Sequence, residues 1–212
     1  MSLRHLWQLG TIPTLLVACC LTTVSSTRAD SLSGNRLSID SGGRAVGRFQ
    51  PDAYYGSQEC CGATGQTAST TTSIDTSGVR YPAPQAVYQT LRYAVAPGYF
   101  VYFFSNLTPS TTYRVRLHFA EFILDGANQR QFNVTAQGQT VLTNFDIYAA
   151  AGGKNRAVVR SFTAQTNNIG QLTLAFRPGQ VGNPQVNGIE LVSINPNDRA
   201  SLNSIQLRIK DR

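Results

Sequence analysis

The stretch of residues 113–122 constrains the fold most, because its side chains alternate between apolar and polar. Apolar residues fall at positions 113, 115, 117 and 119, and polar ones at 114, 116 and 118. A period of two is typical of a β-strand with one buried face and one face in water. The strand runs out at Glu121 and Phe122 into a loop, residues 123–128. Loops at strand ends are where a β-scaffold commonly places its binding residues.

The rest of the chain indicates an all-β protein. Its 212 residues suit one domain with short appendages, and 42% of them are hydrophobic but only 14% charged. Short strand-like segments separated by turns predict roughly ten strands, as in a sandwich. The aromatic run at 99–104 predicts a strand covered on both faces. The long Gly-, Ser- and Thr-rich segment 49–76 predicts a functional or disordered loop. The other predicted strands are 36–40, 87–93, 130–135, 140–147, 157–162, 170–176 and 186–192.

The N-terminus has the pattern of a targeting segment. Arg4 precedes an apolar run at 12–24, and small residues follow up to Ala29. This pattern predicts a secretory signal peptide at 1–29. Leu16-Val17-Ala18-Cys19 also resembles a bacterial lipobox, so a lipidated Cys19 is one alternative and an uncleaved anchor is another. Membrane attachment is expected only if Cys19 is lipidated.

The expected domain borders follow from these patterns. Residues 30–35 form a lead-in, 36–194 the domain, and 195–212 a tail. The tail is either an added edge strand or the beginning of a linker. The net charge is +7, but the basic residues are scattered, so no nucleic-acid partner is predicted.

Cys60 and Cys61 are adjacent in the sequence. In an oxidising compartment they predict a strained disulfide with each other or a cross-link between two chains, and the alternative is a loop pair without a role. Structural zinc takes more ligands than this pair supplies. No metal site and no cofactor are predicted.

Several motifs resemble the malectin domain family, and they occur in the family's order between residues 36 and 194. Singly each is weak, but the ordered set is specific. The blocks are Ile39-Asp40-Ser41-Gly42-Gly43, with Asp where the family has Asn; Tyr88-Gln89-Thr90-Leu91-Arg92-Tyr93; Leu117-His118-Phe119-Ala120-Glu121; Arg130-Gln131-Phe132-Asn133-Val134; Asn144-Phe145-Asp146-Ile147 with Ala151-Gly152-Gly153; and Asn183-Pro184-Gln185-Val186-Asn187-Gly188-Ile189-Glu190-Leu191.

The resemblance implies a jelly-roll β-sandwich of the galactose-binding-like type and a secreted, non-catalytic module that binds an oligosaccharide or cell-surface glycan. Sugars bind to rigid aromatic faces and a few oriented polar groups. Tyr93 matches a ligand tyrosine of the animal lectin, although it could instead be a core or edge tyrosine. The other candidates are Tyr54 and Tyr55 on the preceding loop, Phe122 and Asn183.

Other ligand positions of the lectin are changed in this sequence. Ile123 and Leu124 replace its two loop aromatics, and Gly182 replaces its Asp. Plant relatives form receptor-kinase ectodomains whose ligand need not be a glycan. The alternative function is therefore an extracellular protein-interaction or structural module with an eroded sugar site.

An enzyme is not predicted. His118 has no Ser or Cys motif beside it that would make a catalytic triad, and it is expected to be a surface or cross-strand residue. Glycoside hydrolysis needs two carboxylates across a cleft, for which Glu121, Asp125 and Asp146 are the candidates. Glu121 and Asp146 lie inside the resemblance blocks, which favours hydrogen bonding within the scaffold.

Overall fold

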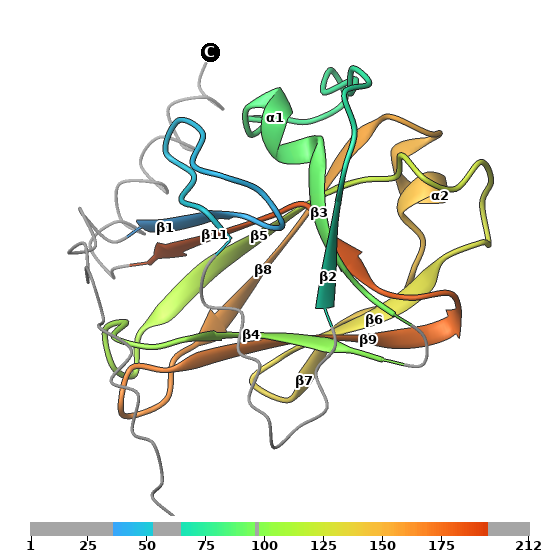
Figure 1. The fold of residues 1–212 in the computed structure, drawn as a ribbon. Helices are drawn as coiled ribbons and strands as arrows, with labels where there is room; N and C mark the ends of the chain where they lie inside the picture. Colours follow the sequence, from blue (N-terminus) through green and yellow to red (C-terminus); the bar gives the residue numbers. More distant parts are fainter. Residues whose placement is uncertain (1–35, 53–64, 96–97, 195–212) are drawn as a thin grey trace, which may run out of the picture. The chain divides into compact units, whose positions relative to one another are not determined.

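The computed structural model describes residues 36–52, 65–95 and 98–194, which belong to one compact unit (Figure 1). The predicted signal peptide, lead-in and tail, together with Tyr54, Tyr55, Cys60 and Cys61, lie outside the described residues. Their roles stay predictions.

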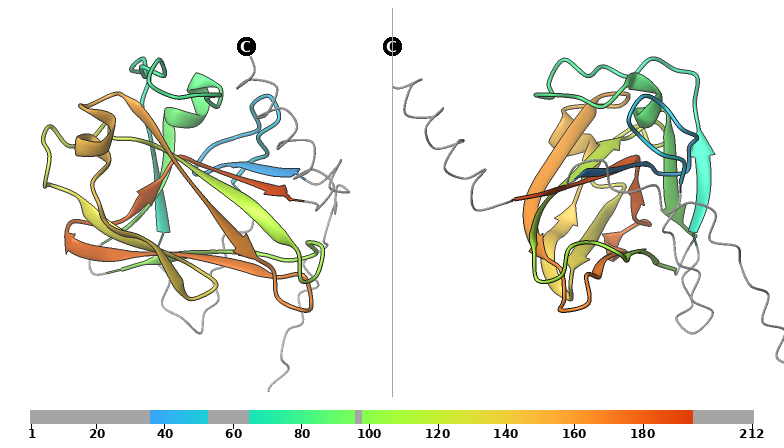
Figure 2. Two further views of the ribbon diagram at one scale, coloured as in Figure 1. Left: turned by 180° about the vertical axis from the view of Figure 1, so that it is seen from behind. Right: turned by 90° about the vertical axis from the view of Figure 1, so that its left-hand side faces the viewer.

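The described residues form a β-sandwich with two short helices, as the alternating patterns predict. One layer is a four-stranded antiparallel sheet in the order β1-β11-β5-β8, and the facing layer has the order β4-β9-β6-β7 (Figures 1 and 2). A three-stranded sheet, β10-β3-β2, lies at one side. The strands are β1 (Arg36–Asp40), β2 (Gly65–Ser69), β3 (Thr90–Ala94), β4 (Phe100–Phe104), β5 (Thr112–Ala120), β6 (Gln131–Ala136), β7 (Gln139–Phe145), β8 (Ala157–Gln165), β9 (Leu172–Val181), β10 (Gln185–Val186) and β11 (Gly188–Ser193).

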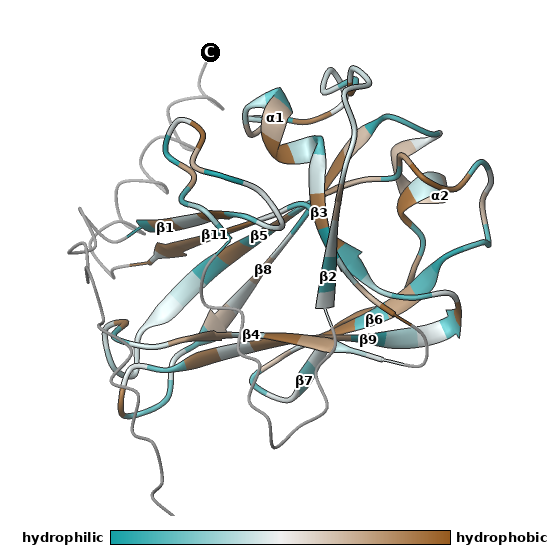
Figure 3. Ribbon diagram, viewed as in Figure 1, coloured by the Kyte–Doolittle hydropathy of each residue, from teal (hydrophilic) through white to brown (hydrophobic). Residues whose placement is uncertain are grey.

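The main core lies between the two four-stranded sheets, and β5 supplies its centre. Val115, Leu117 and Phe119 are fully buried, as their spacing predicts. The Phe119 ring lies 5.0 Å from the Phe145 ring and 5.9 Å from the Phe132 ring, both of the opposite sheet. Figure 3 shows β4 and β11, which border this core, as largely hydrophobic. Burial of these side chains is the main source of stability.

A second, smaller core covers the other face of the β5 sheet. It is built by the segment after β1, the segment before β3, and helix α1 (Gln85–Tyr88). Its buried residues are Phe49, Ile74, Ala83, Val87, Tyr88, Ala120 and Ala157. The polar face of β5 is therefore covered in part, which the alternation alone does not predict.

Two predicted strands differ from the structure. Residues 87–93 were expected to be one strand, but α1 ends at Tyr88 and β3 begins at Thr90. Pro84, at the N-cap of α1, suits the start of a helical turn, because proline's fixed φ and missing N–H cost nothing there. The aromatic run was expected to be covered on both faces, yet β4 is an edge strand and Phe103 is 41% exposed. The long segment 49–76 also contains β2.

Candidate functional site

Tyr93 lies on β3 between two glutamines of its neighbouring strands. It pairs with Gln66 of β2 and with Gln185 of β10, so all three side chains share one face of the small sheet. The Tyr93 ring is half-buried, and its hydroxyl donates to Oε1 of Gln66 at 3.0 Å. Gln185 is fully buried, its amide donates to the Ala120 carbonyl at 3.0 Å, and its Oε1 has no partner. This face therefore carries a partly accessible aromatic ring and, below the surface, an amide oxygen without a hydrogen-bond partner.

A buried ion pair holds three loops together next to Tyr93. The Arg130 Nε donates to Oε2 of Glu121 at 2.7 Å, and its Nη1 donates to the Asn183 carbonyl at 2.7 Å. The other Glu121 oxygen accepts from the backbone N–H groups of Ile123 and Leu124, at 3.0 and 3.1 Å. The scaffold role expected for Glu121 is confirmed. The sequence did not predict this role for Arg130, which was identified only as part of a family motif.

These contacts bring the predicted binding loops to one end of the sandwich. The Ala94 N–H donates to the Pro184 carbonyl at 3.1 Å, which joins the end of β3 to the segment that contains Asn183. We define the rim as Tyr93, Val95, Ile123, Val181 and Asn183. Its three aliphatic members are exposed, Val95 by 42%, Ile123 by 45% and Val181 by 41%.

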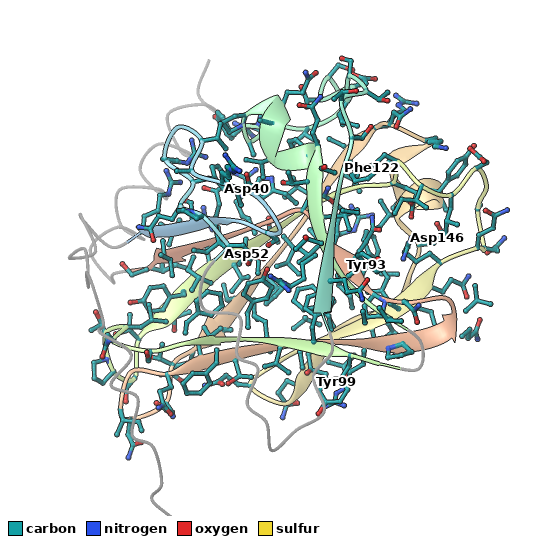
Figure 4. All side chains as sticks on the ribbon, viewed as in Figure 1. Asp40, Asp52, Tyr93, Tyr99, Phe122 and Asp146 are labelled. Atoms are coloured by element: carbon teal, nitrogen blue, oxygen red, sulfur yellow. The ribbon has the colours of Figure 1, made fainter. Side chains whose placement is uncertain are left out.

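Phe122 is turned partly toward the second core. It is half-buried and packs against the cluster that contains Val87 and Tyr88. Figure 4 shows Phe122 apart from Tyr93, on the side where β3 begins. Phe122 thus has a packing role in addition to the predicted place in the site.

A second polar cluster lies on the opposite face of β3, toward the core (Figure 4). Both oxygens of Asp52 are used. Oδ2 accepts from the guanidinium of Arg92 and from the Gly42 N–H at 2.8 Å, and Oδ1 accepts from the Tyr102 hydroxyl at 2.8 Å. The sequence does not reveal this cluster, because its members are 40 and 50 residues from Asp52.

Asp40 lies beside this cluster in a space that Gly43 leaves open. A Cβ at Gly43 would clash with the Asp40 carboxylate, and one at Gly42 would clash with the Leu91 carbonyl. The pKa of Asp40 rises from 3.8 to about 7, mainly because the group is buried and secondarily because Asp52 repels its charge. A hydrogen bond from the Thr90 hydroxyl, at 2.5 Å, opposes this rise.

His118 is fully buried, so the expectation of a surface histidine is wrong, and the cross-strand alternative is correct. Its Nε2 lies 2.9 Å from Oε1 of Glu190 on β11, and its Nδ1 lies 2.9 Å from the Tyr88 hydroxyl. Glu190 is also fully buried and is paired with Arg48 at 3.0 Å. The second core covers this chain of groups, and a substrate cannot reach it.

The three carboxylates considered for glycoside hydrolysis all have structural contacts. Glu121 binds Arg130, as described above. Asp146 caps helix α2 (Ile147–Ala151) by accepting from the Ala149 N–H at 2.9 Å, and Asp125 pairs with Lys154 at 2.6 Å. The scaffold role expected for Asp146 is confirmed.

Within the described ranges, no three His, Cys, Asp or Glu side chains are grouped so that they could hold a metal ion. No helix of the same ranges is both long enough and apolar enough to cross a membrane.

The described residues form an antiparallel β-sandwich in which the segments that follow β3, β5 and β9 are joined at one end. The family model described as the Malectin domain matches residues 35–189. The chain therefore belongs to the malectin family, as its motifs predicted.

Known relatives are plant receptor kinases. The receptor-like protein kinase ANXUR2 of Arabidopsis thaliana is 35% identical over 133 residues, which is 53% of this chain and 15% of that protein. ANXUR1 of the same plant is 34% identical over 128 residues, or 51% of this chain and 15% of that protein. The chain thus spans only a small part of these relatives.

Solved structures show the same fold. The ANX2 ectodomain from Arabidopsis thaliana superimposes with a TM-score of 0.66 at 24% identity, covering 75% of this chain and 49% of that one. A chain in the crystal structure of the plant peptide RALF23 in complex with FER and LLG2 superimposes with a TM-score of 0.66 at 21% identity. The match covers 76% of this chain and 49% of that one. This chain spans about half the length of each.

Proposed function

We propose that this chain is a non-catalytic recognition module that acts outside the cell, secreted or at its surface, and binds a protein or peptide through the rim. The observation that carries this proposal is the exposure of three aliphatic side chains, Val95, Ile123 and Val181, on the segments that the contacts described above join. Protein interfaces have an apolar centre surrounded by polar groups, and exposed apolar clusters commonly mark such sites. The ectodomain relatives support an extracellular role.

A second candidate function is glycan binding at the same rim. Tyr93 offers one aromatic face, and the partly exposed Asn183 offers polar groups for hydroxyls. The positions that carry loop aromatics in the sugar-binding relatives hold Ile123 and Leu124 here. A single, half-buried ring supports only weak binding, millimolar to high micromolar, or about 4–6 kcal/mol.

Two titrations separate these functions. Gluco-, manno- and galacto-oligosaccharides are added to the wild type and to Tyr93→Ala, with NMR as the readout. If no glycan shifts a signal at about 10 mM, the glycan candidate fails. If a glycan binds the wild type but not Tyr93→Ala, it replaces the protein candidate.

The protein candidate is tested by selecting peptides from a display library on the full chain. Selected peptides should lose affinity for Ile123→Ser and keep it for Ile169→Ser, because Ile169 is 64% exposed but lies on a different loop, between β8 and β9. Equal binding to both variants would show that the rim is not the site.

A further inference from the structure

An open cleft of about 570 Å³ lies along β8, away from the rim. Its lining comes from four places: residues 78–81 before α1, Arg114 and Arg116 of β5, Ala150 of α2, and the consecutive residues 158–161 of β8. Neighbouring residues of a strand point to opposite faces of its sheet. Because four consecutive residues of β8 line the cleft, the cleft follows the edge of this strand and not one face of the sheet.

That edge has free backbone groups. Figure 2 shows β8, in orange, as the outermost strand of its sheet. At its start, the Ala157 N–H donates to the Asp75 carbonyl at 2.8 Å, on the side away from β5. Alternate residues repeat this orientation, so Val159, Ser161 and Thr163 also direct their N–H and C=O groups outward. The Val159 carbonyl is occupied, because it accepts from the Arg160 guanidinium at 3.2 Å. Within the described ranges, no backbone group pairs with Ser161 or Thr163 on that side.

The cleft is also strongly basic. Four arginines line it, Arg80, Arg114, Arg116 and Arg160, and no acidic residue does. Arg116 is partly neutralised by Glu190 at 3.6 Å, and it holds the neighbouring loop by donating to the Arg80 and Tyr81 carbonyls. Among the described residues, the other three arginines have no carboxylate partner. A cleft lined by one sign of charge favours an oppositely charged ligand.

We propose that this cleft binds an extended acidic segment of a partner protein, which adds to β8 as a further strand. The free N–H and C=O groups match the repeat of a peptide backbone, as in other cases of strand addition. A polysaccharide has no such repeat, so the edge favours a peptide over an anionic glycan. A residue on the added strand lies roughly 10 Å from Arg114, two strand spacings away, and the two long side chains span that distance.

This inference concerns a second site and goes beyond the proposed role of the rim. Charged side chains on edge strands can also serve only to prevent aggregation. A protective role predicts no bound peptide, whereas strand addition predicts binding that depends on both charge and backbone.

The test uses a synthetic octapeptide that alternates Glu with Val and Thr, titrated by calorimetry into the full chain at low and high salt. The acidic peptide should bind, and more weakly at high salt. Methylation of its alternate backbone amides should abolish binding, because strand pairing needs their N–H groups. The same peptide with Lys in place of Glu should not bind.

The location is tested with Arg114→Glu, because Arg114 is exposed and contributes to the scaffold, among the described residues, through its backbone strand pairing. This change should weaken binding about tenfold or more. The matched control is Arg177→Glu on β9, an exposed arginine of the facing sheet, which should bind as the wild type does. Thermal melting of both variants checks that they fold.

Each contrary result overturns a defined part of the proposal. No binding leaves the arginines as protection for the edge, and equal binding of the methylated peptide excludes strand addition. If the acidic peptide binds Arg114→Glu as tightly as the wild type, the site lies elsewhere. If a carboxylated polysaccharide binds and the peptide does not, the cleft is a glycan site. Ile123→Ser, a change in the rim, should leave binding of the acidic peptide unchanged. The test of the cleft is therefore independent of the test of the rim.

Discussion

Nε2 of His118 lies 2.9 Å from Oε1 of Glu190, and both side chains are fully buried. Burial lowers the pKa of His118 below its ordinary value of 6.5, against the attraction of Glu190. Burial would raise the pKa of Glu190, but the hydrogen bonds and charges of His118 and Arg48 outweigh it and lower the value from 4.5 to about 2. At neutral pH the pair is therefore a neutral imidazole that donates to a carboxylate, while the Tyr88 hydroxyl donates to the other ring nitrogen.

The first prediction concerns this pair. Glu190→Gln should lower the free energy of unfolding by about 2–3 kcal/mol, because it removes charge-assisted hydrogen bonds in a buried place. Urea unfolding at pH 7 measures the change. Asp125→Asn is the control, since Asp125 is 82% exposed and its pair with Lys154 is worth at most about 1 kcal/mol. If Glu190→Gln and Asp125→Asn lower the free energy of unfolding equally, the buried contacts of Glu190 do not contribute more to stability than an exposed ion pair.

The second prediction concerns pH and Asp40. Its folded pKa of about 7 exceeds the unfolded value of 3.8, so its contribution to stability is complete below 3.8 and is lost as pH rises through about 7. Asp40→Asn removes this loss and keeps an oxygen that can accept from Thr90. The Tm of the variant relative to the wild type should therefore rise between pH 5 and pH 8.

His118 changes the dependence of stability on pH in the opposite direction. His118, whose folded pKa is lowered, makes both proteins less stable as pH falls below about 6.5. For this reason the comparison is the difference in Tm between variant and wild type, measured at each pH. A difference that stays constant from pH 5 to pH 8 would mean that Asp40 does not titrate in this range.

The third prediction concerns the core. Phe119→Ala should cost about 3–5 kcal/mol, because the fully buried ring fills the space between two phenylalanines of the facing sheet. Phe103→Ala should cost much less, since that ring is 41% exposed on an edge strand. Thermal unfolding of both variants checks the difference. Wild-type stability of Phe119→Ala would contradict the packing described here.

Much of the fold could be predicted from the sequence, because it depends on local alternation. The buried positions of β5 follow from a period of two, and ordered motifs indicated the family. The pattern misplaced His118 because segments distant in the sequence cover the polar face of β5, and alternation carries no information about them. It also misjudged β4, where Phe103 continues an aromatic run on the exposed face.

The candidate site was predicted only in part. The motifs located the loops that carry Tyr93 and Asn183, but not the contacts that hold the loops together. The pairing of Arg92 with Asp52 and the free edge of β8 depend on the order of strands in each sheet. Spacing along the chain does not determine that order.

Arg116 illustrates the difference between what the sequence pattern predicts and what the contacts in the structure predict. Its place on the polar face of β5 predicts that Arg116→Ala is close to neutral, which the contacts do not support. The side chain is only 14% exposed, donates to two loop carbonyls and lies near Glu190. We expect its removal to cost about 1–2 kcal/mol. Arg114→Ala, on the same face but exposed, is the matched control and should be nearly neutral in thermal unfolding.

The last prediction concerns Arg130, which joins the loops of the rim. Arg130→Ala should cost about 2–4 kcal/mol, because it leaves the buried Glu121 carboxylate without its partner and frees the Asn183 carbonyl. Hydrogen exchange should speed up at Ile123 and Leu124, whose N–H groups donate to Glu121, and stay unchanged in β1, which β11 separates from β5. Arg130→Lys keeps the charge but cannot reach both partners with a planar fork, so it should restore only part of the stability. Uniformly faster exchange would indicate global destabilisation. No change at Ile123 and Leu124 would show that Arg130 does not hold the rim.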